Sequence, residues 1–136
     1  DDVDLAAAVN ADGVHLGQSD AAITEARTVL GPQAVIGVSC YNDIDRARQA
    51  VAAGADYLAF GSVYLSATKP QAARAPLSLF AEARLFTDCP LVAIGGIDAG
   101  NAAAVSAAGA DALAVIDAVF SADDIQKAAA DIAACI

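Results

Sequence analysis

Residues 54–61 read Gly54-Ala55-Asp56-Tyr57-Leu58-Ala59-Phe60-Gly61, a turn of small residues followed by one aspartate and a short apolar run. The same pattern occurs at Ala11-Asp12-Gly13-Val14-His15-Leu16-Gly17 and at Gly109-Ala110-Asp111-Ala112-Leu113-Ala114-Val115-Ile116. Each copy follows an alanine-rich stretch of helical character. This order is typical of a helix that ends near glycine and leads into a buried strand.

Two further apolar runs, at residues 34–39 and 90–95, lie between the copies. They bring the number of predicted strands to five, and all are apolar on both faces, as a parallel sheet covered by helices requires. The strands are expected to start near Val14, Val35, Tyr57, Leu91 and Ala112. Helices are expected over residues 3–10, 20–30, 43–53, 77–86, 100–108 and 123–134.

The spacing of the strands limits the fold to two α/β architectures. Successive strand starts are 21, 22, 34 and 21 residues apart, and the shorter intervals each fit one βα unit. Regular βα units form either a (βα)8 TIM barrel or an open sheet, here a five-stranded flavodoxin-like one. The repeats favour the barrel, which usually needs about 200–250 residues. We therefore expect residues 1–136 to be a single partial TIM-barrel domain that supplies the last five βα units, with the N-terminal units missing.

The composition excludes several partners. The chain has 17 acidic and 7 basic residues and a net charge of −10, which disfavours nucleic acid and anionic membranes. No apolar run approaches the roughly 18 residues of a membrane span, and no secretory signal is visible, so we expect a cytoplasmic protein. The three scattered cysteines, Cys40, Cys89 and Cys135, fit reduced thiols. Small phosphorylated molecules remain compatible partners, because metal ions and main-chain N–H groups bind phosphate locally. The composition is also compatible with a homo-oligomer.

In both architectures the functional residues follow the carboxyl ends of the strands. Asp20 is therefore a candidate metal ligand, although aspartate also suits a helix N-cap. Ser39 is placed either to contact a ligand or to cap a helix. His15 fits a hydrogen-bonded interior histidine better than a catalytic base. Cys40 fits a small buried side chain better than a nucleophile, because the chain has no second histidine to activate it.

Two loops are candidate anion sites. The loop from Gly61 to Lys69 is long and gathers hydroxyl groups and a lysine, and with Arg74 it forms either a local cationic site or a solvated loop. Gly95-Gly96, between a strand and a helix, would allow phosphate to approach the backbone closely. With residues 116–118 these glycines would form the last two loops of a barrel, where its phosphate site commonly lies.

These motifs resemble the thiamine phosphate synthase (thiamine-phosphate pyrophosphorylase) family over essentially all 136 residues, as its C-terminal two-thirds. The most specific segments are His15-Leu16-Gly17-Gln18-Ser19-Asp20 and Thr68-Lys69. The segments that recur in many phosphate-binding barrels are Gly54-Ala55-Asp56 and Ile94-Gly95-Gly96-Ile97.

The resemblance implies an enzyme that joins a hydroxymethylpyrimidine diphosphate to a thiazole phosphate, with Mg²⁺ as cofactor and a dissociative mechanism. It also implies roles by position. These are Asp1 and Asp20 for magnesium, Ser39 and Lys69 for catalysis, and Ser66, Thr68, Lys69, Gly96, Ile116 and Asp117 for substrate binding.

The chain also departs from the family pattern. Asp117 places an acid beside the phosphate loop, which requires its carboxylate to turn away from the phosphate. The family's upstream Gln-x-Arg-x-Lys strand, which binds the pyrimidine diphosphate, is not in these 136 residues. Two other readings therefore stay open: a regulatory or isomerase-like relative, and another phosphate-binding barrel.

Overall fold

The computed structural model describes residues 1–65, 71 and 73–136, and in this part of the chain five strands alternate with helices. All five predicted strands are present and begin within one residue of the expected positions. In chain order the elements are α1 (Val3–Ala8), β1 (Gly13–Leu16), α2 (Ile23–Leu30), β2 (Val35–Tyr41), α3 (Ile44–Ala52), β3 (Tyr57–Gly61), α4 (Ser78–Arg84), β4 (Leu91–Ile94), α5 (Ala102–Ala107), β5 (Ala112–Ala114), α6 (Asp117–Phe120) and α7 (Ile125–Ala133).

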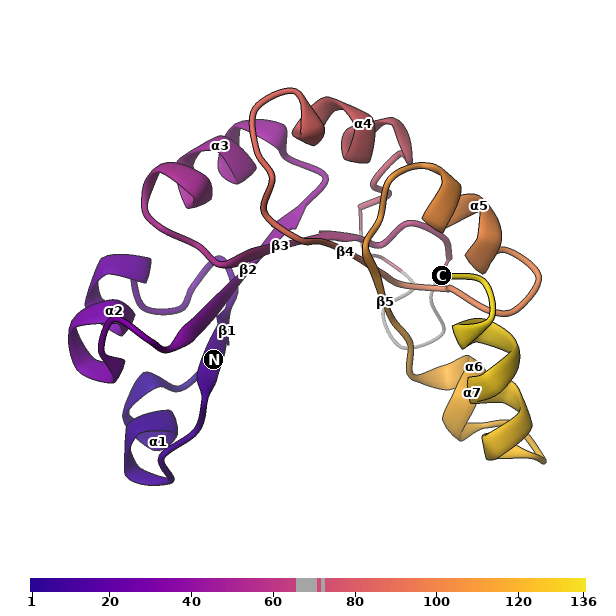
Figure 1. Ribbon diagram of the computed structural model, residues 1–136, viewed down its shortest axis with the longest axis horizontal. Coiled ribbons are helices and arrows are strands. Elements are labelled where there is room, and N and C mark those ends of the chain that lie inside the picture. Colours follow the sequence, from indigo (N-terminus) through magenta and orange to yellow (C-terminus); the bar gives the residue numbers. More distant parts are fainter. Residues whose placement is uncertain (66–70, 72) are drawn as a thin grey trace.

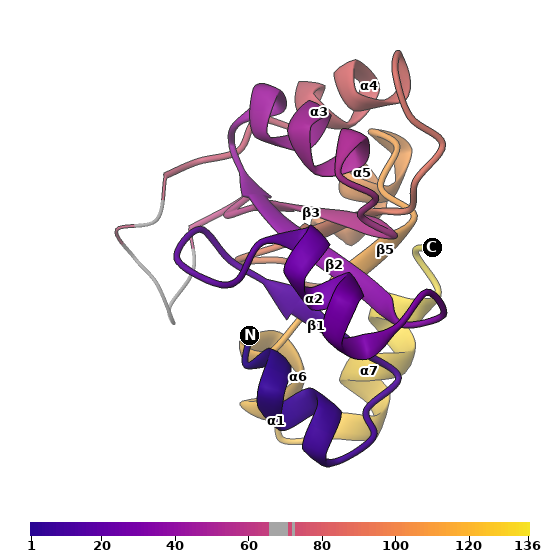
Figure 2. The same ribbon diagram turned by 90° about the vertical axis from the view of Figure 1, so that its left-hand side faces the viewer.

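The strands form one parallel sheet in the order β1-β2-β3-β4-β5, so each strand pairs with the next one along the chain. The sheet bends into an arch, with α2, α3, α4 and α5 on its outer side (Figure 1). Seen from the side, α3, α4 and α5 lie together on one side of the sheet (Figure 2). A flavodoxin-like sheet has the order 2-1-3-4-5 and helices on both faces. The sequential order and one-sided cover instead match an arc of barrel wall.

The helices follow the predicted ranges to within two residues at each end, with two exceptions. α2 begins at Ile23 rather than near residue 20, and its N-cap is Ala22, which makes no side-chain capping bond. The four-residue helix α6 was not predicted, because one turn is too short to show a helical period. No helix in the described part of the chain is long and apolar enough to span a bilayer.

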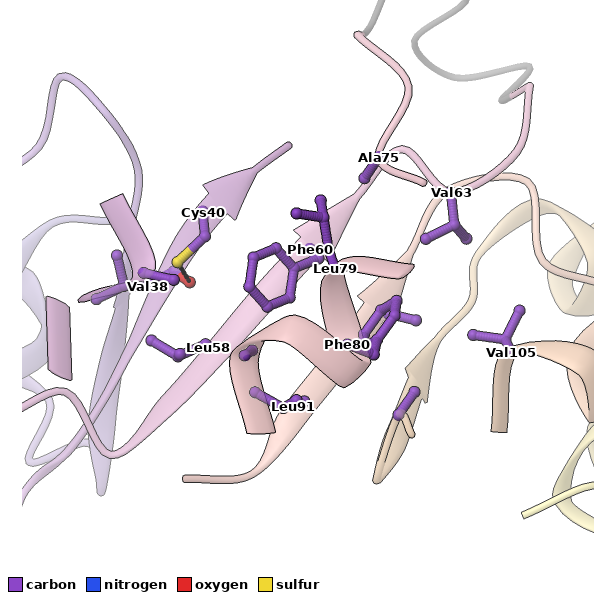
Figure 3. Packing of buried hydrophobic residues seen from close by; sticks show 14 of the residues in the cluster. Val38, Cys40, Leu58, Phe60, Val63, Ala75, Leu79, Phe80, Leu91 and Val105 are labelled. Carbon is purple, nitrogen blue, oxygen red and sulfur yellow. Dashed lines mark hydrogen bonds between the residues drawn. The ribbon is translucent and has the colours of Figure 1, made fainter. Parts of the chain in front are cut away.

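The main core lies between the outer face of the sheet and the helices above it. Phe60 of β3 and Phe80 of α4 are fully buried and meet edge to face, with ring centroids 5.5 Å apart. Leu58 and Leu91, from neighbouring strands, extend the same cluster (Figure 3). Burying each large side chain of this kind contributes about 1.5–3 kcal/mol. Tight packing on this face fixes the strands, and therefore the loops at their carboxyl ends.

The aspartate of the repeated motif binds at the amino end of the sheet. Asp56 Oδ2 accepts a hydrogen bond of 2.7 Å from the N–H of Ile36, at the start of the neighbouring strand. It also pairs with the Arg27 guanidinium at 2.7 Å. Partial burial by itself raises the pKa of Asp56. The hydrogen bond from the Ile36 N–H and the neighbouring Arg27 lower the pKa by a larger amount together, so the pKa lies below its usual value.

The third copy of the motif repeats this arrangement two strands further on. Asp111 Oδ2 accepts a hydrogen bond of 2.6 Å from the N–H of Leu91, and it pairs with Arg84. Arg84 also donates to the carbonyl of Cys89 at 2.7 Å. Residues at the amino-terminal face of a barrel serve stability rather than chemistry. The repeat therefore marks the fold and not the functional site.

Candidate functional site

A cavity of about 440 Å³ opens at the carboxyl ends of β2, β3, β4 and β5. This is the end of the strands at which barrels and open α/β sheets bind ligands. The lining residues come from these strands and the loops that follow them: Ser39, Tyr41, Ala59, Gly61, Ser62, Leu65, Ile94, Gly95, Gly96, Ile97, Asp98, Ala114, Val115, Ile116, Asp117 and Ala118.

Four of the residues that sequence reasoning placed in the site line this one cavity: Ser39, Gly96, Ile116 and Asp117. They come from the ends of β2, β4 and β5, which are distant in sequence. The predicted loop residues Ser66, Thr68 and Lys69 lie outside the described residues.

The side chain of Ser39 is hydrogen-bonded on the inner face of the sheet. Its Oγ lies 2.8 Å from His15 Nε2, and His15 Nδ1 lies 2.9 Å from the Tyr57 hydroxyl. Ser39 does not cap a helix, because the N-cap of α3 is Asp43. His15 is hydrogen-bonded, as expected, but it is only partly buried. Burial lowers the pKa of His15 below its usual value, against a smaller opposing effect of the Asp20 charge, so the ring is neutral at pH 7.

The glycine pair turns the chain sharply at the end of β4. Gly95 and Gly96 have φ angles of 100° and 65°, which favour glycine. A Cβ on Gly95 would lie 2.1 Å from Ser62 Oγ, and one on Gly96 would lie 2.2 Å from the Leu65 carbonyl oxygen. The two glycines therefore make room for the loop after β3. This packing role adds to the close approach of phosphate that the sequence predicts for the glycine pair.

Ile116 lies in the loop after β5, and Asp117 is the first residue of α6. The Asp117 carboxylate accepts a hydrogen bond of 3.0 Å from Ser121 Oγ, one turn later in the chain. This bond ties the acid to the residue that ends α6. The main-chain N–H groups of Gly96 and Asp117 donate to no acceptor within residues 1–65, 71 and 73–136.

Neither predicted magnesium ligand lines the cavity. Asp20 Oδ2 accepts a hydrogen bond of 2.5 Å from the Gly17 N–H, so Asp20 closes the loop after β1 instead of capping α2. Asp1 is exposed, and the first helix is capped by Asp2, which accepts from the N–H of Leu5. The described residues contain no group of three or more acidic, histidine or cysteine side chains around one point.

Arg46 is a residue of this site that sequence reasoning missed. Its Nε donates to the Ser39 carbonyl at 2.7 Å, and its second guanidinium nitrogen donates to the Gly17 carbonyl at 2.9 Å. The guanidinium carbon also lies 5.8 Å from the centre of the Tyr41 ring. Arg46 therefore ties together the carboxyl ends of β1 and β2. No local pattern distinguishes it from the other arginines on helices.

Two other expectations concern residues next to the site. Arg74 does not line the cavity: it donates to the Val63 carbonyl at 3.0 Å and borders a separate hollow. Cys40 is fully buried in the outer core, as expected, and burial raises the pKa of its thiol to about 12. Cys40 is therefore protonated and unreactive at neutral pH.

Known proteins match this chain closely. Residues 1–119 match a family model described as thiamine monophosphate synthase. A thiamine-phosphate synthase from Halorhodospira halophila is 60% identical over 134 residues, which are 98% of this chain and 64% of the relative. The enzyme of that name from Thiobacillus denitrificans is 56% identical over 132 residues, which are 97% of this chain and 63% of the relative.

Two solved structures are also similar to this chain. A thiamine phosphate pyrophosphorylase from Pyrococcus furiosus aligns with a TM-score of 0.84 at 39% identity, over 99% of this chain and 64% of that one. A 3-hexulose-6-phosphate synthase aligns at 0.72 with 23% identity, which shows the fold alone. The TIM-barrel prediction is confirmed. This chain spans 63% to 64% of the length of the two curated relatives. By the match over residues 1–119 and the identity to these relatives, the chain belongs to the thiamine monophosphate synthase family.

Proposed function

We propose that this chain serves the synthesis of thiamine phosphate. In the proposed reaction, 4-amino-2-methyl-5-hydroxymethylpyrimidine diphosphate and 4-methyl-5-(2-hydroxyethyl)thiazole phosphate yield thiamine phosphate and pyrophosphate. One observation carries the proposal. Ser39 of β2, Gly96 after β4, and Ile116 and Asp117 after β5 line one cavity, in a chain whose curated relatives are named thiamine-phosphate synthase.

The thiazole phosphate is proposed to bind at the loops after β4 and β5. Its phosphate would accept hydrogen bonds from the main-chain N–H groups of Gly96 and Asp117, which are otherwise free among the described residues. The hydrogen bond from Ser121 restrains the Asp117 carboxylate. An acidic protein can bind an anion in this way, because main-chain dipoles act locally while the net charge acts at long range.

The diphosphate is proposed to bind toward the β1–β2 side of the cavity. Lys69, Ser66 and Thr68 are the expected contacts in the loop after β3, while Asp1 and Asp20 are the expected ligands of Mg²⁺. Two carboxylates fit this ion, because Mg²⁺ usually takes one or two of them and completes its shell with water and phosphate. When bound, Mg²⁺ would neutralise charge that develops on the leaving diphosphate.

The proposed chemistry breaks the bond between the pyrimidine methylene carbon and the diphosphate oxygen, and the electron pair leaves with pyrophosphate. The thiazole nitrogen then donates its lone pair to the methylene carbon and forms the new C–N bond. Lys69 would stabilise the departing charge, and Ser39 would contact the reacting pyrimidine from the cavity wall. Fixed charges and dipoles of this kind are usually the largest contribution to catalysis.

The proposal includes a cytoplasmic location. The three cysteines are all free, although Cys89 and Cys135 are only partly buried. Free thiols of this kind persist in reducing compartments. Small phosphorylated molecules, rather than nucleic acid or membrane, are the proposed partners.

The test uses two proteins: the 136-residue chain, and a chimera in which the chain replaces its matching part of the Halorhodospira halophila relative. We expect the chimera to form thiamine phosphate from both substrates, with loss of activity in EDTA and recovery on adding Mg²⁺. We expect the chain alone to bind the thiazole phosphate in calorimetry but to turn over little, because it lacks the upstream pyrimidine-binding strand. The intact relative is the positive control.

Three outcomes would contradict the proposal or a part of it. A folded chimera that binds the thiazole phosphate without forming product would indicate a regulatory relative. A chimera that binds a sugar phosphate but not the thiazole phosphate would indicate another phosphate-binding barrel. Rapid turnover by the isolated chain would contradict the predicted need for the upstream strand.

A further inference from the structure

The inner face of the sheet contains a row of three residues in register across β1, β2 and β3. His15 pairs with Gly37, and Gly37 pairs with Tyr57. Because Gly37 has no side chain, the His15 and Tyr57 rings meet above it, with centroids 5.5 Å apart. A Cβ on Gly37 would lie 1.9 Å from Tyr57 Cζ, so a larger residue would expel the tyrosine ring. The middle strand is therefore shaped to bring the two rings together.

Ser39 completes a chain of hydrogen bonds. It follows Gly37 by two residues on the same strand and therefore shares its face of the sheet. The hydroxyl of Tyr57 lies 2.9 Å from His15 Nδ1, and Ser39 Oγ lies 2.8 Å from His15 Nε2. Of the three polar side chains, Ser39 alone lines the cavity at the carboxyl ends of the strands.

The chemistry of the three groups decides which one donates. A neutral imidazole has one N–H donor and one acceptor nitrogen. Burial lowers the pKa of His15 and raises that of Tyr57, so both are neutral at pH 7. A phenol is a stronger acid than an alcohol and therefore the better hydrogen-bond donor. Tyr57 then donates to Nδ1, which leaves the proton of His15 on Nε2, where it is donated to Ser39 Oγ.

This assignment leaves the Ser39 proton without an acceptor among the described residues. Ser39 Oγ accepts from His15, and its O–H has no acceptor among the described residues. Arg46 holds the backbone of the same serine through its carbonyl at 2.7 Å. The serine is therefore fixed at both its main chain and its side chain, and its proton is directed at whatever occupies the cavity.

We infer that His15 and Tyr57 are positioning residues that orient Ser39 as a hydrogen-bond donor to an acceptor atom of the bound substrate. This inference rests on the proposed function for the identity of that substrate. It goes beyond that function by giving the only histidine of the chain, and a tyrosine on a different strand, a role in the reaction. Tyr57 acts through His15, and His15 acts through Ser39.

The first test reads the histidine tautomer directly. Long-range ¹H–¹⁵N correlation spectra of the chimera, with the His15 signal assigned from its loss in His15→Gln, are expected to show the proton on Nε2. In Tyr57→Phe, which keeps the ring but removes the donor, the proton is expected to redistribute toward Nδ1. A proton on Nδ1 in the unmodified protein would overturn the inference. This readout does not depend on turnover, so it distinguishes failure of the inference from failure of the proposed function.

The second test is a double-mutant cycle on the chimera. Tyr57→Phe is expected to lower kcat about tenfold, which corresponds to one well-oriented hydrogen bond, with a smaller effect on KM. In a Ser39→Ala background the same change is expected to have less than about a twofold effect, because the group it orients is gone. Equal losses in both backgrounds would show that Tyr57 is merely structural and would overturn the inference. Unchanged kcat in Tyr57→Phe would do the same.

Discussion

Asp20 and Asp56 are the same residue type beside the same kind of strand, yet they lie at opposite ends of the sheet. Asp56 pairs with Arg27 and with the N–H of Ile36 at the amino end, where its contacts are structural. Asp20 lies at the carboxyl end, where its one hydrogen bond within the described part of the chain comes from the Gly17 N–H of its own loop. An aspartate with a single hydrogen bond keeps free lone pairs for a cation, whereas Asp56 uses its carboxylate on the protein. An aspartate at the amino end of a strand is therefore used within the protein, whereas one at the carboxyl end is left available for the proposed cation.

At the residue scale, we predict that Lys69→Ala lowers the rate of thiamine phosphate formation by the chimera at least about tenfold. Loss of one charged contact to a leaving group costs on the order of 2–4 kcal/mol of transition-state stabilisation. The matched control is Lys127→Ala, which removes an exposed lysine paired with Asp131 on α7. Steady-state kinetics with both substrates measure the effect. Equal rates for the two variants would assign Lys69 to the solvated surface.

At the scale of elements, the loops of neighbouring strands depend on one another. Gly95 accepts a hydrogen bond of 3.0 Å from the N–H of Tyr64, and Ile94 accepts one of 3.0 Å from the N–H of Val63. The loop after β3 therefore rests on the turn after β4, and the missing side chains of Gly95 and Gly96 make this contact feasible. Arg46 joins the ends of β1 and β2 in a comparable way. The rim of the cavity is built from pairs of adjacent βα units.

The contacts at the opposite end of the sheet support a stability prediction. We expect Asp111→Ala to lower the free energy of unfolding by about 1–3 kcal/mol, because the Leu91 N–H and the Arg84 guanidinium both lose their acceptor. Asp88→Ala, an exposed aspartate in the turn before β4, is the control and is expected to change it by less than about 0.5 kcal/mol. Urea unfolding measures both. A loss of the same size in both variants would contradict a specific role for Asp111.

At the scale of the whole molecule, α2 to α5 cover the outer side of the arched sheet, while α1, α6 and α7 lie at the two ends of the arch (Figure 1). β1 and β5 are the edge strands, and each pairs with a single neighbour within the described residues. Several large apolar side chains near the β5 end are exposed, including Ile94, Ile116 and Phe120. Unpaired strand edges and apolar surface both favour association between chains.

This arrangement predicts that the isolated 136-residue chain associates with itself. Sedimentation velocity is expected to show a weight-average mass that rises with concentration above the 13.5 kDa of one chain. The chimera, which supplies more of the barrel, is expected to associate less. A strictly monomeric chain at all concentrations would contradict the idea that its edges need further covering.

Acid is expected to weaken the fold through the low pKa of Asp56. A carboxyl whose pKa is lower in the folded state stabilises the protein above its unfolded pKa, here 3.8. That contribution is lost as the pH falls through the lower folded pKa. Urea unfolding between about pH 5 and pH 2.5 is therefore expected to show a steeper loss for the unmodified chain than for Asp56→Asn. Parallel curves would contradict the assignment.

Local patterns along the chain were enough to predict the five strands, their parallel arrangement and the ends of the strands that carry the candidate site. These features depend on local apolar patterns and on the spacing of βα units, which can be read along the chain. The sequence also placed Ser39, Gly96, Ile116 and Asp117 in one site, because parallel strands carry their carboxyl ends on one edge. Two features are visible only in the folded chain: Gly37 makes room for Tyr57 beside His15, and Arg46 ties Gly17 to Ser39. These contacts join residues on different strands and helices, and their partners depend on sheet register and side-chain direction, which no local pattern contains.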